Sequence, residues 1–231
     1  GALALWLANG RQWWIGGLAG LLAGLAHLTR ADGVLLLPVV LLGVILRVRA
    51  TRGGFRATAA GCSLVALGYL LVMGPWFMRN LLTVGSLLGS GGMKTLWLTT
   101  YDDVYCYGCD LSLRAYLAWG WGNILDLKLT ALWVNSQRFV AENCLVFLFP
   151  LALIGYYRLR RRPPFFLSLV YLLLVYGAHS LAFSYPGVRG GFFHASAPLL
   201  PFVYTAAVEG LDAAVGWIGR RRRWRNLRQA Q

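Results

Sequence analysis

The sequence predicts an all-α membrane protein, a polytopic bundle of about six transmembrane helices, from its composition and its long apolar runs. Hydrophobic residues make up 58% of the chain and charged residues 13%, whereas soluble domains carry about 25% charged residues. Two runs, Ala57–Met78 and Pro163–Val188, contain no charged side chain. A helix needs roughly 20 apolar residues to cross the hydrocarbon core, so each run is long enough to span a membrane.

Further candidate spans lie before, between and after these two runs. The candidate spans are Trp13–Leu28, Gly33–Leu46, Ala57–Pro75, Glu142–Tyr157, Phe165–Phe183 and Ala195–Gly219, with a partial run at Gly1–Ala8. The first two are short for a core about 30 Å thick, so the turn between them should lie within the membrane boundary. A re-entrant hairpin is the alternative for runs of this length.

The sequence begins inside an apolar run, Gly1–Ala8. This run contains neither an initiator Met nor the basic stretch of a signal peptide. We therefore expect a further part of the protein to precede Gly1.

Fifteen of the 22 basic residues occur in every second connection between the expected spans. They are Arg11, then Arg47, Arg49, Arg52 and Arg56, then Arg158 and Arg160–Arg162, and finally Arg220–Arg223, Arg225 and Arg228. The positive-inside rule makes this face cytoplasmic and predicts a multi-pass protein of the cell inner (plasma) membrane. Because topology and anionic headgroups account for the net charge of +14, we expect membrane lipids as partners and no nucleic acid.

The expected organisation has four parts. Residues 1–75 form transmembrane helices with an outer turn at Arg30–Asp32, and residues 76–139 form an extracytoplasmic loop. Residues 140–219 form further transmembrane helices, and residues 220–231 form a basic cytoplasmic tail. Within the loop, Ser112–Gln137 is predicted as an amphipathic helix lying at the membrane interface, where its tryptophan side chains favour the headgroup level.

Arg30 and Asp32 are the first candidates for a binding site, because ionisable groups in a shallow membrane turn usually have a partner or a function. One interpretation is structural, with a snorkelling arginine paired to its neighbour Asp32. The other has the Arg30 guanidinium bind an anionic lipid phosphate, for which its planar fork of donors is suited.

Two further arginines lie on the same expected outer face. Arg79 follows Pro75 at a predicted span terminus, where it could also be an interfacial anchor. Arg189 occupies a turn with three glycines, and His194 follows at the head of the last span. If the outer turns converge, Arg30, Arg79 and Arg189 would form a lipid-phosphate clamp completed by His194.

The outer loop contains the remaining polar candidates. Asp102 and Asp103, beside Tyr101, are adjacent carboxylates that could act as a base, hold a metal or simply be solvated. Cys106 and Cys109 are expected either as a local disulfide or as two free thiols, since no second CxxC accompanies them to hold zinc. No pattern identifies a cofactor, and a divalent metal stays open but unsupported. His27 and His179 are interpreted as buried packing groups.

Several stretches resemble the GT-C superfamily of membrane glycosyltransferases, in the branch of protein O-mannosyltransferase-like and aminoarabinose-transferase-like enzymes. Leu28–Gly33 is similar to its LTR-x-DG hairpin, and Pro75–Asn80 with the following Gly85-Ser86 is similar to its PWxxRN…G signature. Phe149–Gly155 and Arg189–His194 are similar to later landmarks. The resemblance covers most of the chain, as a C-terminal portion of such an enzyme.

This resemblance implies an inverting glycosyltransferase that moves a sugar from a polyprenyl-phosphate donor to an unknown acceptor on the extracytoplasmic face. Arg30 matches a position near the donor phosphate, and Arg79 and Arg189 match motif arginines. The family's catalytic carboxylate would lie before Gly1, so no catalytic residue is assigned here, and Asp102 and Asp103 are not given that role. The alternatives are a transporter or lipid carrier without bond chemistry, disfavoured by the lack of a visible repeat, and a non-catalytic membrane scaffold.

Overall fold

The computed structural model describes residues 14–89, 91–92, 94–106 and 108–222, and all regular structure within them is helical. Four helices in these residues are long and apolar enough to cross a membrane. They are Ala31–Ala50, Phe55–Val84, Pro163–Ala182 and Ser184–Arg221, and the shorter helix Trp14–Thr29 is also apolar. The all-α class is thus confirmed for the described residues, whereas six spans are not confirmed. The run Gly1–Ala8, Arg11 and the tail from residue 223 lie outside the described residues.

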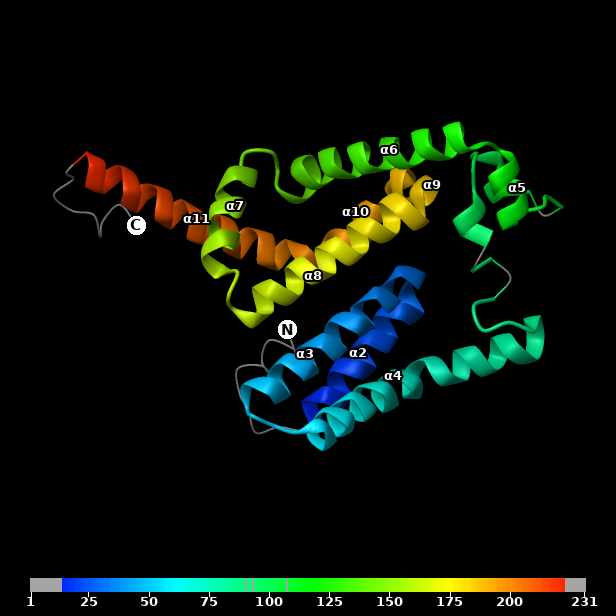
Figure 1. The fold of residues 1–231 in the computed structure, drawn as a ribbon, viewed down its shortest axis with the longest axis horizontal. Coiled ribbons are helices and arrows are strands. Elements are labelled where there is room, and N and C mark those ends of the chain that lie inside the picture. The colour runs from blue at the N-terminus through cyan, green and yellow to red at the C-terminus, as the bar shows by residue number, and fades with distance from the viewer. Residues whose placement is uncertain (1–13, 90, 93, 107, 223–231) are drawn as a thin grey trace.

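The first group of helices contains α2 (Trp14–Thr29), the 3₁₀ turn η1 (Ala31–Leu35), α3 (Leu36–Ala50) and α4 (Phe55–Val84). Helix α2 lies directly against α4 (Figure 1) because glycines form the contact. A Cβ on Gly20 would fall 2.0 Å from the Val65 carbonyl oxygen, and one on Gly68 would fall 2.1 Å from that of Gly17. Small residues allow this backbone approach, as is common between membrane helices.

Helix α4 continues beyond the end expected for its span. It contains Pro75 in its interior and ends at Val84, where Gly85 takes up a left-handed conformation with φ of +75°. Glycine adopts this conformation without the steric penalty that a Cβ would bring. The boundary expected between residues 75 and 76 therefore falls inside a helix, and the connecting loop begins after Val84.

The loop contains the short turns η2 (Lys94–Trp97) and η3 (Asp102–Val104), followed by helices α5 (Leu113–Ala118) and α6 (Trp121–Arg138). The sequence predicted one helix over Ser112–Gln137, whereas the structure has two. They are separated at Gly120, whose φ of +104° is incompatible with a continuous helix.

The second group begins with η4 (Phe139–Asn143), α7 (Phe149–Leu159), α8 (Pro163–Gly177) and η5 (Ala178–Ala182). The chain continues through α9 (Ser184–Pro186), η6 (Gly187–Gly191), α10 (Phe192–Ser196), η7 (Ala197–Leu199) and α11 (Leu200–Arg221). The largest cluster of buried side chains lies here and includes Tyr171, Val175, Phe192, Leu199 and Val203.

The predicted span Glu142–Tyr157 is wrong as a continuous helix. A turn interrupts it at residues 144–148, where Leu145 and Val146 have φ of +49° and +57°. The helix that follows, α7, has 11 residues, too few to cross a membrane without additional structure. The span was predicted from apolar composition alone, and apolar composition does not indicate where the backbone turns.

Helices α7 and α11 cross each other at small residues. A Cβ on Gly155 would fall 1.7 Å from the Ala206 carbonyl oxygen, and one on Gly210 would fall 1.9 Å from that of Leu151. An ion pair at 3.4 Å joins Arg158 of α7 to Glu209 of α11. Glycine at both contact points is what brings the two backbones together.

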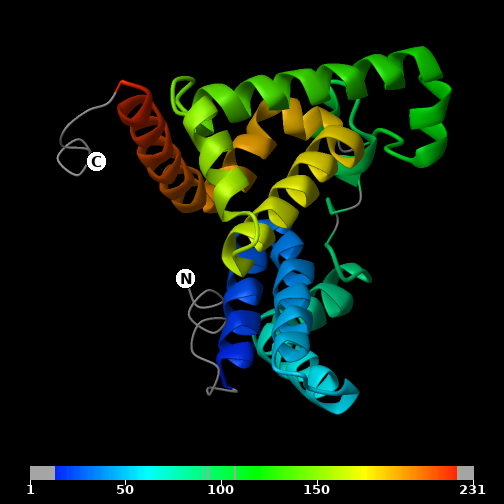
Figure 2. The ribbon, with the colours of Figure 1, turned by 60° about the vertical axis from the view of Figure 1, so that its left-hand side comes forward.

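The two groups of helices meet through α3, η1 and α8, as the views in Figures 1 and 2 indicate. Val39 of α3 belongs to the same buried cluster as Tyr171 of α8. In Figure 1 the α3–α4 connection, the α7–α8 connection and the last turn of α11 lie toward the left, whereas η1, the end of α4 and α9 lie toward the right. The described arginine-rich connections therefore lie toward one side of the molecule.

Candidate anion-binding site

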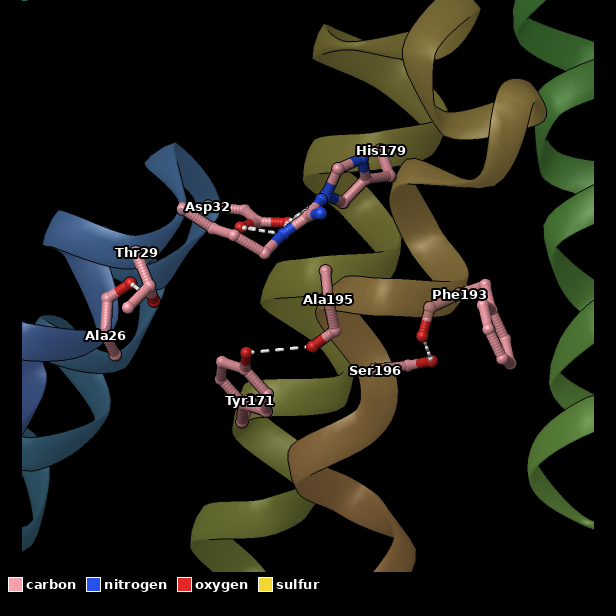
Figure 3. A network of polar contacts seen from close by, with 9 residues as sticks. Ala26, Thr29, Asp32, Tyr171, His179, Phe193, Ala195 and Ser196 are labelled. Atoms are coloured by element: carbon pink, nitrogen blue, oxygen red, sulfur yellow. Dashed lines mark hydrogen bonds and ion pairs between the residues drawn. The ribbon is translucent and has the colours of Figure 1, made fainter.

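The site begins at the turn between α2 and α3. Helix α2 ends at Thr29, whose hydroxyl donates a hydrogen bond to the Ala26 carbonyl oxygen at 2.8 Å (Figure 3). Arg30 then takes up an extended conformation, with φ of −151° and ψ of 138°. Its backbone N–H donates to Ala26 and its carbonyl oxygen accepts from Gly33. The helix end and the following 3₁₀ turn thus fix the backbone on both sides of Arg30.

The Arg30 guanidinium forms a two-pronged ion pair with the Asp32 carboxylate. Nε lies 3.1 Å from Oδ1 and Nη2 lies 3.1 Å from Oδ2. The Arg30 side chain is 47% exposed, whereas Asp32 is 13% exposed. A largely buried carboxylate therefore orients a cation whose remaining donors are open to an anion, the geometry that favours a forked contact with phosphate.

His179 of η5 also lies beside Asp32 (Figure 3) and approaches the same carboxylate oxygen, Oδ2, as Arg30 does. Its Nε2 is 3.6 Å from Asp32 Oδ2, within ion-pair distance but longer than a hydrogen bond. The side chain is 7% exposed, and neither ring nitrogen has a hydrogen-bond partner in the described part of the chain. We had expected His179 to be a packing group. Its ring is indeed buried, but it also faces Asp32.

The helix pair that presents His179 is held by buried hydrogen bonds. The Tyr171 hydroxyl of α8 donates to the Ala195 carbonyl oxygen of α10 at 2.9 Å (Figure 3). The Asn135 side-chain amide of α6 donates to the His179 carbonyl oxygen at 3.3 Å and to the Ser180 hydroxyl at 3.1 Å. These bonds satisfy polar groups in an apolar environment and hold α8 against α10 and η5 against α6.

Arg79 lies near the end of α4, where its side chain contacts its own neighbours in the sequence. The guanidinium is 5.2 Å from the centre of the Trp76 ring and donates to the Asn80 side chain at 3.3 Å. Asn80 is buried and donates to the Leu87 carbonyl oxygen, which ties the loop to the helix end. These contacts agree with the second interpretation of Arg79, in which the arginine is an anchor at the membrane interface and not a phosphate-binding residue.

Arg189 connects the loop to the helix bundle. Its guanidinium lies 5.2 Å from the Tyr101 ring centre and 5.7 Å from that of Tyr185, within the range of cation–π attraction. Gly190, with φ of +106°, forms the kink beside it. His194 is exposed on α10 and contacts the Phe193 ring. Within the described part of the chain, the arginines at positions 30, 79 and 189 share no side-chain partner, so their convergence on one ligand stays a prediction.

The two loop aspartates have different environments. Asp103 Oδ2 accepts hydrogen bonds at 2.8 Å from the backbone N–H groups of Thr99 and Thr100 and from the Thr99 hydroxyl. Partial burial raises the pKa of Asp103, but these hydrogen bonds outweigh it, and the pKa lies below its usual value. Asp103 thus closes the loop, whereas Asp102 is exposed.

The structure joins Cys106 and Cys109 in a disulfide, which selects one of the two states expected from the sequence. Among the described residues, no group of three His, Cys, Asp or Glu side chains is placed to hold a metal ion. The candidate site is therefore built from Arg30, Asp32 and His179.

Comparisons with protein-family models, with curated proteins and with solved structures found no significant match to this chain. The resemblance to the GT-C superfamily accordingly rests on the short motifs.

Proposed function

We propose that this chain is part of a membrane glycosyltransferase that takes a sugar from a polyprenyl-phosphate donor on the extracytoplasmic face. The observation that carries the proposal is the Arg30–Asp32 pair, a half-exposed guanidinium held by a largely buried carboxylate at the end of an apolar helix. This pair lies within the stretch that resembles the family's LTR-x-DG hairpin.

The proposed chemistry needs a cation at this position. When a sugar leaves a lipid phosphate, negative charge grows on the phosphate oxygens, and a pre-oriented guanidinium stabilises it. Arginine suits this role because its charge is permanent and its donors match two phosphate oxygens. Arg30 would supply the phosphate end of the site, and a carboxylate base would activate the acceptor hydroxyl.

The arrangement of the arginine-rich connections supports the proposed orientation. They lie toward one side of the molecule, and η1 with Arg30 lies toward the other (Figure 1). By the positive-inside rule the first side would be cytoplasmic, which would place Arg30 on the face where polyprenyl-phosphate sugars are proposed to react.

The test measures sugar transfer, in membranes, from a radiolabelled polyprenyl-phosphate sugar by the full-length protein of which this chain is proposed to be a part. Replacing Arg30 with Ala should lower transfer by about a hundredfold or more, as the loss of a transition-state charge donor does, while membrane insertion is unchanged. Arg30→Lys should restore part of the activity. Arg161→Ala, which removes an exposed arginine in the α7–α8 connection, is the matched control. Wild-type transfer by Arg30→Ala would refute the proposal, and lipid translocation without transfer would favour the carrier alternative.

A further inference from the structure

The loop between α4 and α6 contains a pocket that the Arg30 site does not use. Its volume is about 410 Å³, toward the lower end of the range of roughly 300–1,000 Å³ for small-molecule sites. Three aromatic rings and two carboxylates line it, from Trp97, Tyr116, Trp119, Asp103 and Asp110. The described residues that line the pocket include no Lys, Arg or His. The pocket therefore combines apolar ring surfaces with negative charge.

Local bonds hold the walls of the pocket in place. The hydrogen bonds that Asp103 accepts from the turn before it close the wall that carries η2. The Ser112 hydroxyl oxygen accepts from the Ala115 backbone N–H at 3.2 Å and so caps α5. The disulfide between Cys106 and Cys109 ties the segment between these two walls. Little ordering of the loop is left for a ligand to bring about, which favours binding.

The three rings form one cluster with Tyr116 at its centre. The Trp97 ring centre lies 5.8 Å from that of Tyr116, and the Trp119 ring centre lies 6.2 Å from it. The Tyr116 side chain is buried, whereas both indoles are partly exposed. Tyr116 thus supports two indoles that still have ring surface to offer. A ligand with a flat apolar face of C–H groups suits such surfaces.

The two carboxylates still have acceptor capacity. All the hydrogen bonds that Asp103 accepts go to Oδ2, and within the described residues Oδ1 has none. Asp110 is exposed and its carboxylate has no hydrogen bond to the described chain. An ionised carboxylate only accepts hydrogen bonds, so the ligand has to donate them. A phosphate or a carboxylate ligand would be repelled here.

A cationic ligand is disfavoured by a lysine behind the ring cluster. The Lys128 ammonium lies 5.9 Å from the Tyr116 ring centre, within cation–π range, and donates to the Leu181 carbonyl oxygen. A second ammonium placed against the same cluster would be repelled by the first. An uncharged ligand meets no such penalty. A sugar ring has the remaining features, hydroxyl donors together with a face of C–H groups.

We propose that this pocket binds one uncharged sugar unit, its ring against the two indoles and its hydroxyls donating to Asp103 Oδ1 and Asp110. That this sugar belongs to the acceptor rests on the proposed function. Helix α5 lies toward the same side of the molecule as η1 (Figure 1). The anionic donor would then bind at Arg30 and the uncharged acceptor at the loop carboxylates, so the sign of the local charge sorts the two substrates.

Fluorine NMR of the full-length protein in nanodiscs, labelled with fluorotryptophan, tests the site. The probes are the methyl glycosides of glucose, galactose and mannose, at millimolar concentration. At least one should shift the signals of Trp97 and Trp119, assigned by substitution with Phe, and leave the exposed Trp133 signal unchanged. Glucose 6-phosphate should shift neither. No shift with any of the three glycosides, or a stronger effect of methyl glucosaminide, which carries an ammonium, would overturn the proposal.

Substitutions test the contacts one by one. Trp119→Ala should weaken binding of the responding glycoside by about tenfold, through loss of the ring contact. Asp110→Asn should weaken it by about fivefold, because a neutral amide accepts less strongly than a carboxylate. Asp110 makes no hydrogen bond to the described chain, so its loss leaves the loop intact. Asp126→Asn removes an exposed carboxylate of α6 outside the pocket and is the matched control. Wild-type affinity in both pocket variants would overturn the proposal.

The transfer assay separates this inference from the proposed function. Glycoside binding in the pocket without any transfer from a polyprenyl-phosphate sugar would overturn the proposed function and, with it, the acceptor role. Arg30-dependent transfer with no response of Trp97 or Trp119 to the glycosides would overturn the inference alone. Where both hold, the bound glycoside should accept the labelled sugar or inhibit its transfer, and a glycoside that does neither would overturn the acceptor role.

Discussion

Replacing Gly33 with Ala should disturb the site through its backbone rather than through a charged side chain. Gly33 is buried where η1 passes the end of α2. A Cβ there would lie 2.3 Å from both the carbonyl carbon and oxygen of Ala26, and 2.6 Å from the His27 nitrogen. All three are backbone atoms, so no side-chain rotation relieves the overlap, and η1 must move away from α2.

The size of the movement follows from these distances. Ordinary van der Waals contact begins at 3.4 Å, so the closest approach has to grow by about 1.1 Å. Helix α8 packs against the other side of η1, so the displacement presses Asp32 toward His179. Overpacking of this kind costs about 2 kcal/mol in a well-packed interior. For a chain of this length that corresponds to a fall of about 4–8 °C in the unfolding temperature.

Thermal unfolding of the full chain in detergent measures this effect, followed by circular dichroism. The matched control is Gly177→Ala, on α8 close to His179, where an added Cβ meets no atom within 4 Å. The control should melt at the wild-type temperature or slightly above it, because alanine favours a helix. Gly33→Ala should also bind undecaprenyl phosphate more weakly than the control. Equal unfolding temperatures for Gly33→Ala, the control and the wild type would refute the packing argument.

Two further predictions concern other parts of the molecule. Gly155→Ala should lower the unfolding temperature by several degrees, because its Cβ would overlap the Ala206 backbone, and Gly122→Ala, which meets open space, should not. The lowered pKa of Asp103 stabilises the loop at and above the usual carboxyl range. That stabilisation is lost as the pH falls through the lowered value. Hydrogen-exchange protection of residues 94–106 should therefore drop only when the pH falls below the usual carboxyl range, and Asp103→Asn should lack it already at pH 6. Protection independent of pH would contradict this reading.

Long apolar runs predicted the main helices correctly because a helix that crosses a membrane needs a minimum length of apolar residues, which can be counted in the sequence. Where the prediction was wrong, a backbone feature decided the result. The run Glu142–Tyr157 is interrupted by Leu145 and Val146 at positive φ, a conformation that those residue types do not favour. Helix α4 also continues through Pro75 to Val84, and the membrane boundary expected at Pro75 stays a prediction. Neither outcome can be deduced from hydropathy, since both depend on packing around the chain.

In the candidate site, too, a contact between near neighbours in the sequence could be predicted, whereas a contact between distant residues could not. The pairing of Arg30 with Asp32 was foreseen as one of two alternatives because the residues are two apart in sequence. The contact of Asp32 with His179 joins η1 to η5 and depends on how the two groups of helices meet. A signal for it did exist, since a histidine inside an apolar run usually has a partner. Hydropathy identifies such a residue but does not say which distant carboxylate it faces.

The position of this contact also couples the site to the assembly of the bundle. Asp32 belongs to the first group of helices and His179 to the second, and the groups meet where α3 and η1 touch α8. In an apolar environment an ionisable group without a partner is strongly disfavoured. Each of these two residues therefore favours the docked arrangement of helices that brings the other within reach. A substitution at Asp32 should accordingly affect both the orientation of Arg30 and the docking of the two groups. A substitution at Arg30 should affect the site but leave the Asp32–His179 contact to hold η5 against η1.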